Sequence, residues 1–251
     1  MRIAFAVAAA GLLAGCVTTE TVQFQPKASQ QAMVRDGQAA LVSRLKNSIV
    51  MVRPASRQFQ VGARPIFVVA IYNLTHGPLE FRVANVEVTQ FINQQPAALK
   101  VVTYEQLVSE EKDRQVFRAI GAGLVVASNS MAASNAGYYH ANSTVYTPRG
   151  GTYQVSTTGY SPTAAAIAQT NANIQNEAVI SATIERGQAN LGALEGSVIK
   201  DNTLMPGEWY GGQLHIQPLV SETGSAAKTY QIAVNVGTDR HEIEIAQGGA
   251  R

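Results

Sequence analysis

Four histidines are the side chains of this chain best suited to bind a metal ion or to transfer protons. They are His76, His140, His215 and His241. They lie far apart, so the H-x-H and H-x-x-x-H spacings that bring two imidazoles onto one metal ion are absent from the sequence. We expect each histidine to lie in a turn or on the surface of a strand, and we predict no metal site and no cofactor.

The densest group of acidic residues is the second candidate for chemistry. Glu110, Glu111 and Asp113 alternate with Lys112 and Arg114 in a segment that has a helical pattern. Mixed charges at this spacing are typical of a solvated helix face. They do not favour a carboxylate pair for acid–base catalysis or for metal binding.

Two glycine-containing stretches lack the context that a ligand-binding motif needs. Gly121-Ala122-Gly123 lies inside a helical pattern with no lysine after it, so it indicates helix packing and not a phosphate loop. Trp209, the only tryptophan, stands between Pro206-Gly207 and Gly211-Gly212. We expect it to pack in the core or at its rim, with ligand stacking as the alternative. No G-x-S-x-G motif is present, and we predict that the protein is not an enzyme.

The only cysteine is Cys16, at the end of an apolar segment that follows Arg2. Leu13, Ala14 and Gly15 precede it, and this Leu-Ala-Gly-Cys sequence resembles the lipobox of bacterial lipoproteins. The resemblance implies cleavage before Cys16 by signal peptidase II and acylation of its thiol and of the new amino group. Two or three acyl chains form a stable anchor. A cleaved signal peptide with an incidental cysteine and a transmembrane helix are the two alternatives. The apolar segment is too short for the ~20 residues of a spanning helix.

The resemblance also implies a destination. Val17 follows the cysteine where an aspartate would retain an enteric-type lipoprotein at the inner membrane, so we expect an outer-membrane, lipid-anchored protein that faces the periplasm. We assign residues 1–15 to the signal peptide and residues 16–28, which are polar, to a lipidated tether. Without a second cysteine, no intramolecular disulfide can form.

The composition excludes some partners and sets the size of the folded part. The formal net charge is +2, so nothing points to nucleic acid. Charged residues make up 14% of the chain, against ~25% in ordinary soluble domains. About 236 residues would remain after cleavage before Cys16, enough for one large domain or for one domain with an insertion.

Apolar segments with strand-like alternation lie at both ends of the mature chain. Residues 65–92 predict a hairpin with one buried face, and the change of phase at Ala84-Asn85 predicts a bulge. Residues 204–219, 230–236 and 242–246 alternate in the same way. The predicted architecture is an antiparallel β-sandwich whose strands are separated into two sets.

Residues 29–47 have a different pattern. Ser29 can cap a helix, and Met33, Leu41 and Leu45 recur at near-helical spacing. We therefore assign residues 29–103 to an N-terminal helix and the first half of the sandwich, and residues 201–251 to its second half.

Two turn motifs resemble those of immunoglobulin-like domains in bacterial envelope proteins. The first follows an apolar strand and the second precedes one: Asn73, Thr75, Pro78, Leu79 and Phe81, then Leu204, Pro206, Gly207 and Gly211. The resemblance implies an α+β chain in which an immunoglobulin-like sandwich is interrupted by a long helical hairpin.

Residues 104–200 form that predicted insertion. A helix over 104–134 has a heptad-like apolar stripe, and its uncharged second half places Ala119, Gly123 and Ala127 at four-residue spacing, which permits close contact with another helix or another subunit. A second helix begins at Pro162 and extends to about residue 200. Its glycines make it a poor isolated helix, so we expect it to pair with the first.

The tip of the insertion, residues 138–160, predicts a β-hairpin in one of two settings. Its arms are rich in Tyr, Thr and Ser, with Tyr138, Tyr139, Tyr146, Tyr153 and Tyr160 near their ends. In the first setting the tip is a mobile polar loop. In the second, several subunits each give a hairpin to a shared membrane barrel, because nine or ten residues suffice for a tilted strand to cross a bilayer.

Three functions remain open on these grounds. The first is a non-enzymatic outer-membrane lipoprotein that acts as a structural or assembly component of an envelope complex, with envelope protein partners and a homo-oligomer formed through the insertion. The second is a subunit of an oligomeric pore or secretion channel that uses hairpin 138–160. The third is a periplasmic ligand-binding lipoprotein with a pocket near Trp209.

Overall fold

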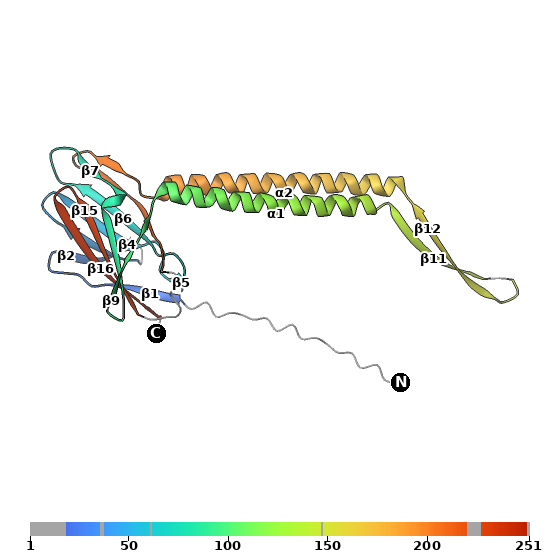
Figure 1. The fold of residues 1–251 in the computed structure, drawn as a ribbon, viewed down its shortest axis with the longest axis horizontal. Helices are drawn as coiled ribbons and strands as arrows, with labels where there is room; N and C mark the ends of the chain where they lie inside the picture. The colour runs from blue at the N-terminus through green and yellow to red at the C-terminus, as the bar shows by residue number, and fades with distance from the viewer. Residues whose placement is uncertain (1–18, 36–37, 61, 147, 220–226, 250–251) are drawn as a thin grey trace, which may run out of the picture. The chain divides into compact units, whose positions relative to one another are not determined.

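The computed structural model describes residues 19–35, 38–60, 62–146, 148–219 and 227–249. The chain divides into two compact units (Figure 1). One consists of the residues up to Thr103 together with those from Ser197 onward, and the other is Tyr104–Gly196. Within the described ranges the protein is mixed α/β, with mostly antiparallel sheets and two long helices.

Two six-stranded antiparallel sheets form the first unit. In spatial order, the strands of one sheet are β5 (Phe59–Gln60), β1 (Thr19–Phe24), β16 (Asp239–Gly249), β15 (Lys228–Val236), β8 (Val86–Ile92) and β9 (Gln95–Leu99). Those of the other are β10 (Val101–Val102), β14 (Trp209–Ile216), β6 (Ile66–Asn73), β4 (Ser48–Pro54), β3 (Gln38–Arg44) and β2 (Gln30–Arg35). A separate short pair joins β7 (Leu79–Phe81) to β13 (Asn202–Leu204).

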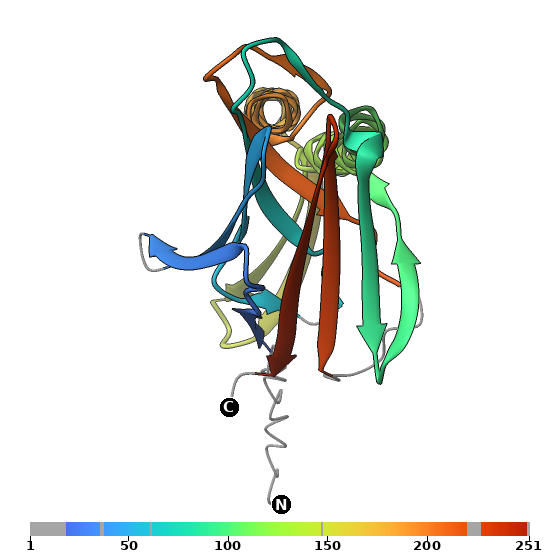
Figure 2. The same ribbon diagram turned by 90° about the vertical axis from the view of Figure 1, so that its left-hand side faces the viewer.

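The two sheets share one hydrophobic core (Figure 2). Every second residue of β4 and β6 is buried, as period-two alternation requires when one face of a sheet is covered. Phe67 of β6 and Tyr230 of β15 contact edge to face across the sheets, with ring centroids 5.9 Å apart. This arrangement is consistent with the predicted β-sandwich interrupted by a helical insertion.

The helix predicted over residues 29–47 is wrong. Strands β2 and β3 occupy this stretch and pair with each other from Gln30↔Ser43 to Arg35↔Gln38. The near-helical spacing of a few apolar residues did not decide the structure, because β3 pairs with β4. This pairing supplies backbone hydrogen-bond partners, and it buries Leu41 in the core. A signal for the hairpin exists in the sequence, since residues 36 and 37 are Asp-Gly, a pair favoured in two-residue loops.

The tether predicted over residues 16–28 is wrong for residues 19–24. Thr19–Phe24 forms β1, which pairs with β16 and β5. Val22 and Phe24 alternate with polar residues and pack against the core, so the period-two pattern was present in the sequence. Cys16 and the lipobox residues Leu13, Ala14 and Gly15 lie outside the described residues.

The hairpin predicted over residues 65–92 is also wrong. Strands β6 and β8 belong to different sheets, and the short β7 between them pairs with β13. The change of phase at Ala84-Asn85 marks a turn of 3₁₀ helix over Val83–Asn85, not a bulge, and this turn leads into β8. By contrast, the strands predicted at 230–236 and 242–246 are present as β15 and β16, which pair from Val236↔Asp239 onward, around a glycine with positive φ.

The two motifs that resemble immunoglobulin-like turns lie together in one corner of the first unit. The buried Asn73 side chain donates to the carbonyl oxygens of Gly77 and Leu204, and its own backbone carbonyl accepts from Gly207 N. Gly211 faces Ala70 across the β14–β6 pair, where a Cβ atom would lie 2.5 Å from Val69 O. Only glycine permits this close approach of the two backbones.

The second unit contains helices α1 (Tyr104–Asn135) and α2 (Pro162–Ser197), with strands β11 (Tyr138–Tyr146) and β12 (Thr152–Tyr160) between them. Both predicted helices and the predicted hairpin are confirmed in position and type. Ser161 caps α2, since its hydroxyl accepts from Ala164 N at 3.3 Å. The strands of the hairpin pair from Tyr138↔Tyr160 to Tyr146↔Thr152.

Candidate functional site: the outward faces of the insertion

The histidines do not form a site. His76 and His140 are exposed, as predicted, but His215 and His241 are buried, so the prediction that they lie on the surface is wrong. Both stand in central strands whose alternating residues point into the core. Among the described residues no group of three His, Cys, Asp or Glu side chains could hold a metal ion.

A buried polar cluster surrounds His241 and contains the residue types of a hydrolase triad. Its Nδ1 lies 2.9 Å from Ser43 Oγ and its Nε2 lies 2.8 Å from Ser48 Oγ, which donates to Asp239 Oδ2 at 2.9 Å. In a catalytic triad the aspartate orients the histidine directly. Here Ser48 stands between them, and His241 is fully buried. The cluster therefore joins β3, β4 and β16 and cannot reach a substrate.

Burial lowers the pKa of His241 below its ordinary value of 6.5, because the charged imidazolium loses its hydration in the core, and the carboxylate of Asp239 opposes this only partly. The histidine is therefore neutral near neutral pH. One ring nitrogen then donates and the other accepts, which fits one hydroxyl on each side of the ring.

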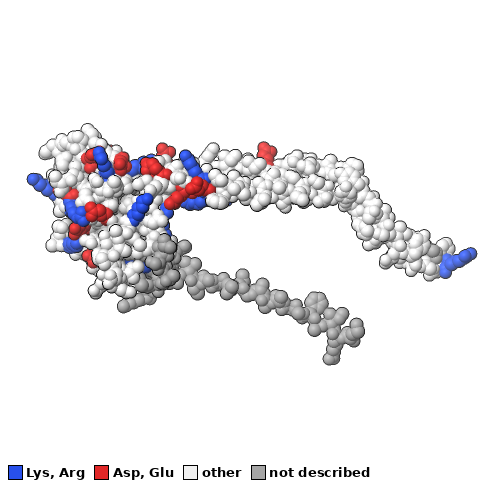
Figure 3. Space-filling view, viewed as in Figure 1, with Lys and Arg blue, Asp and Glu red and all other residues white. Residues whose placement is uncertain are grey.

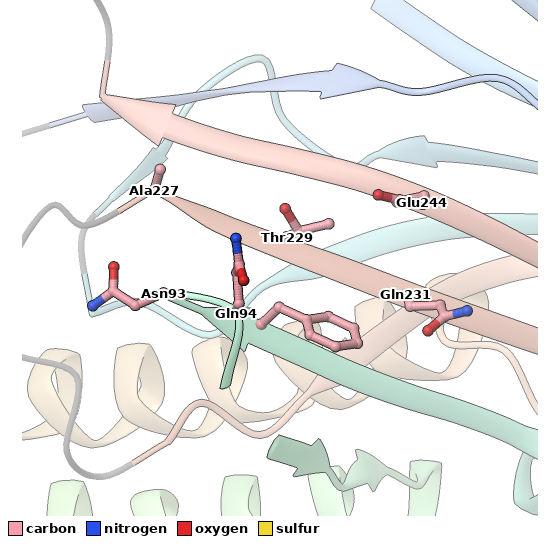
Figure 4. Close-up of a pocket in the computed structure, with 7 residues that line it drawn as sticks. Asn93, Gln94, Ala227, Thr229, Gln231 and Glu244 are labelled. Carbon is pink, nitrogen blue, oxygen red and sulfur yellow. The ribbon is translucent and has the colours of Figure 1, made fainter. Parts of the chain in front are cut away.

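A surface pocket of about 400 Å³ lies on β8, β15 and β16 (Figure 4). Its lining is Phe91, Asn93, Gln94, Ala227, Thr229, Gln231 and Glu244. One carboxylate among amides and a hydroxyl provides neither a nucleophile with its base nor a metal-ligand set. Trp209 is not in this pocket: it is 53% exposed and packs on Tyr72 at 5.0 Å, so it lies at the rim of the sheet.

The contact between α1 and α2 is built from polar and small residues. Asn129 donates to Asn176 Oδ1 at 3.0 Å, and Asn176 Nδ2 donates to Ser130 Oγ at 3.3 Å. Nearer the helix ends that lead to the sheets, Gln115 donates to the Gly187 carbonyl. We call this contact the inner seam. Because all these bonds run between the helices, they fix the pairing and its alignment.

Glu111 is the charged member of the inner seam, and its predicted place on a solvated face is wrong. It is 2% exposed and accepts hydrogen bonds from Asn190 and from Arg118, both at 2.9 Å. Arg114 lies 3.5 Å from its other oxygen. These donors, Asn190 first, hold the pKa of Glu111 below its ordinary value. No sequence pattern around Glu111 indicates this role, because its partner Asn190 comes from α2, far along the chain.

The apolar residues of α1 face away from α2. Phe117 is 74% exposed, Leu124 69% and Met131 68%, and Ile120 and Ala127 are exposed as well. We call these five residues the outer stripe. They are spaced 3, 4, 3 and 4 residues apart, the heptad-like spacing of a helix that packs on another helix. The two helices were predicted to pair without a choice of face, and α2 packs on the side of α1 opposite this stripe.

The small residues predicted to pack helices are all exposed. A Cβ atom added to Gly123 would meet nothing within 4 Å, and the side chains of Ala119 and Ala127 are exposed. The monomer therefore gives these residues no packing role. Their role in contacts between subunits stays a prediction.

The two faces of the β-hairpin differ in polarity. Because paired residues project to the same side, one face carries the polar residues His140, Asn142, Thr144, Gln154, Ser156 and Thr158, with Tyr138 and Tyr160 at one end and Tyr146 and Thr152 at the other. The other carries Ala141, Ser143, Val145, Val155 and Thr157, with Tyr139 at one end and Tyr153 at the other. The ring of Tyr139 covers Gly159, its direct partner, and Tyr138 packs on Tyr160 at 5.0 Å. Aromatic rings thus lie near both ends of the hairpin, Tyr146 included.

Charge is sparse over most of the insertion (Figure 3). Between Ala119 and Asn176 the only Lys, Arg, Asp or Glu is Arg149, beside the hairpin turn. Among the described helices only α1 is long and apolar enough to cross a membrane, and almost none of that stretch is buried. No family model, no curated protein and no solved structure matches the chain.

Proposed function

We propose that this protein is a non-enzymatic lipoprotein of the bacterial outer membrane, anchored through acylated Cys16, that serves as a structural or assembly component of an envelope complex. Its helical insertion mediates self-association. Its two-sheet unit, which we propose to be immunoglobulin-like, docks other envelope proteins from the periplasmic side.

One observation carries this proposal: α1 exposes an apolar stripe, while polar side chains occupy the contact between the two helices. Phe117, Leu124 and Met131 face solvent while Glu111 and Asn176 are buried between the helices. Water-exposed monomeric helices show the reverse order, because burying apolar surface stabilises by about 25 cal/mol per Å². An exposed apolar stripe with heptad-like spacing is the surface that another helix covers.

Lipid anchoring would favour such an assembly. A chain held at a membrane surface meets other copies at a raised effective concentration, so a modest contact suffices for association. Incorporation of labelled palmitate into the wild-type chain, and its loss in Cys16→Ser, tests the anchor. Unchanged processing and membrane fractionation of Cys16→Ser would refute it.

Self-association is tested on the lipidated full chain in mild detergent by sedimentation and light scattering. We expect a discrete oligomer whose mass does not depend on the detergent. A strict monomer over a wide concentration range would refute the proposal that the insertion mediates assembly.

The difference between the two hairpin faces favours a second candidate, the pore or secretion-channel subunit. Each arm has nine residues, the length of a tilted strand across a bilayer, and tyrosines flank the less polar face at both ends. In outer-membrane vesicles, protection of Tyr138–Tyr160 from protease that is lost on adding detergent would support this role. Cleavage of the hairpin in intact vesicles would exclude it.

A further inference from the structure

We infer that copies of the insertion assemble head to tail, with the outer stripe of α1 in one copy packed against the outer edge of α2 in the next. We define this outer edge as Ile167, Ile174, Ala178 and Ser181, all exposed. The inference rests on the proposed self-association and specifies its geometry. The occupant of each apolar edge is a second copy of this chain.

The two edges point in opposite directions. At about 100° per residue, Ile120 and Leu124 lie some 200° round α1 from Ala122, which faces α2. Ile174 and Ala178 lie the same rotation from the buried Asn176 on α2. Each edge is therefore on the far side of its own helix from the inner seam, and one copy presents two separate surfaces.

This placement favours a head-to-tail contact over a two-fold dimer. A two-fold contact joins identical surfaces, so a dimer through α1 would cover both outer stripes and leave both α2 edges exposed. A contact from α1 to the next α2 uses both edges of every copy. When the rotation between neighbours closes, the product is a ring.

The outer stripe of α1 and the outer edge of α2 also lie at the same level along the helix axes. The inner-seam bonds pair Asn129 with Asn176 and Gln115 with Gly187, which places Ala127 level with Ala178. In a ring whose axis runs along the helices, neighbouring copies keep this level. Two exposed alanines then meet, and small side chains permit close approach of the helices. Met131 lies level with Ile174 in the same way.

The β-hairpin extends the same contact. A two-stranded sheet is marginal by itself in water, and each of its strands leaves one edge of backbone N–H and C=O groups unpaired by the other. Pairing β12 of one copy with β11 of the next satisfies both edges and continues the sheet around the ring. The polar face, with His140 and Gln154, would then line the inside, and the face with Val145 and Val155 the outside.

The size of the helix contact shows how much the strands must add. The outer stripe extends over 15 residues, from Phe117 to Met131, which is about 22 Å of helix at ~10 Å width, so each side buries roughly 220 Å². The sum of about 450 Å² is below the ~1,000 Å² of a specific interface, so strand pairing between copies has to supply the remainder.

Membrane lipid is a less suitable partner for the two exposed helix surfaces than a second copy of the chain. The exposed side of α2 carries Asn171, Asn173, Gln175 and Glu177, and α2 does not have the composition of a spanning helix. Burying these groups in hydrocarbon without partners costs several kcal/mol each. A neighbouring copy leaves Asn173, Gln175 and Glu177 at the margins of the contact, where water remains, whereas Asn171, which lies between Ile167 and Ile174, is on the outer edge itself.

Cysteine cross-linking tests this geometry. Lipidated Ala127→Cys is mixed with Ile174→Cys, Ala178→Cys or Ser181→Cys, which sample one helical turn of the opposite edge, and oxidised in mild detergent. Within one copy the introduced thiols at 127 and 178 lie on far sides of two helices, with Cα atoms roughly 13 Å apart, beyond the ~7 Å that a disulfide spans. Every cross-link therefore joins two copies. Wild type measures the background from Cys16, and Ala119→Cys, on the flank of α1, is the matched control.

We expect cross-linked dimers from at least one mixture at a yield well above that of the Ala119→Cys control, and little from any single variant alone. The double variant Ala127→Cys/Ala178→Cys should give a ladder that ends at one closed species. Efficient cross-linking of Ala127→Cys with itself would overturn the inference in favour of a two-fold contact. Oligomers without cross-links in any mixture would also overturn it while leaving the proposed function standing, whereas a strict monomer would overturn both.

Discussion

The substitution Leu124→Gln should weaken self-association without changing the stability of the folded monomer. The Leu124 side chain is 69% exposed in the monomer, so Leu124→Gln removes almost no contact within the chain. Substitutions at such positions change the free energy of unfolding by less than ~0.5 kcal/mol. In the proposed assembly, the Leu124 side chain is buried against the outer edge of α2 of the next copy.

The expected loss follows from the area that remains to be buried. Full burial of a leucine stabilises by about 1.5–3 kcal/mol, and roughly two thirds of this side chain is still open, so each contact loses ~1–2 kcal/mol. This corresponds to an association constant about 5- to 30-fold lower per contact. A ring repeats the loss at every interface, so the oligomer should dissociate over a narrow range of protein concentration.

The assay combines sedimentation of the lipidated chain in mild detergent with thermal unfolding followed by circular dichroism. Val125→Gln is the matched control, because Val125 is a half-exposed apolar residue on the flank of α1, outside the outer stripe. Leu107→Ala is the opposite control: Leu107 is buried, and its truncation should lower stability by about 2–5 kcal/mol. If Leu124→Gln assembles as wild type does, or unfolds at a clearly lower temperature, the assignment of the stripe to an intermolecular contact is wrong.

Three further predictions concern the interior of each unit. Asn176→Ala leaves Asn129 without its partner in the inner seam, so the insertion should lose about 1–3 kcal/mol, measured by hydrogen exchange of the helices. Burial lowers the pKa of His241, so the unfolded chain binds a proton that the folded chain does not. The free energy of unfolding should therefore fall as the pH drops below 6.5. Urea titrations at several pH values should show this decrease, and the contribution of His241 should be absent in His241→Asn. Gly211→Ala should weaken the first unit by several kcal/mol, since its Cβ would meet the backbone of Ala70, and an unchanged urea midpoint would contradict the packing argument.

Sequence patterns were sufficient where an element depends on nearby residues. The helices from Tyr104 and Pro162 and the hairpin between them follow from local periodicity, capping and turn residues. The failures lie in the first unit, where β6 and β8 enter different sheets. A strand pattern reports which face is buried and does not report which strand will be its neighbour.

The buried polar groups were unpredictable for the same reason. Glu111 looked solvated because its own helix supplies only Arg114 and Arg118, and its first partner, Asn190, comes from the other helix. His241 looked like a surface residue because Ser43 and Ser48 are almost two hundred positions away in the sequence. In both cases the partner is brought close only by tertiary structure.

The outer stripe shows why a periodic pattern can predict a contact and still not identify its partner. Helix α1 has two lengthwise surfaces suited to packing: the inner seam through Glu111, Gln115 and Asn129, and the apolar stripe through Leu124 and Met131. Hydrogen bonds fix which of them meets α2, because leaving Glu111 or Asn129 buried without a partner would cost more than leaving a leucine in water. Once α2 occupies the inner seam, no other long helix is available among the described residues. This is why we propose that the apolar stripe finds its partner outside its own chain, since a second copy offers a helix edge of the same kind.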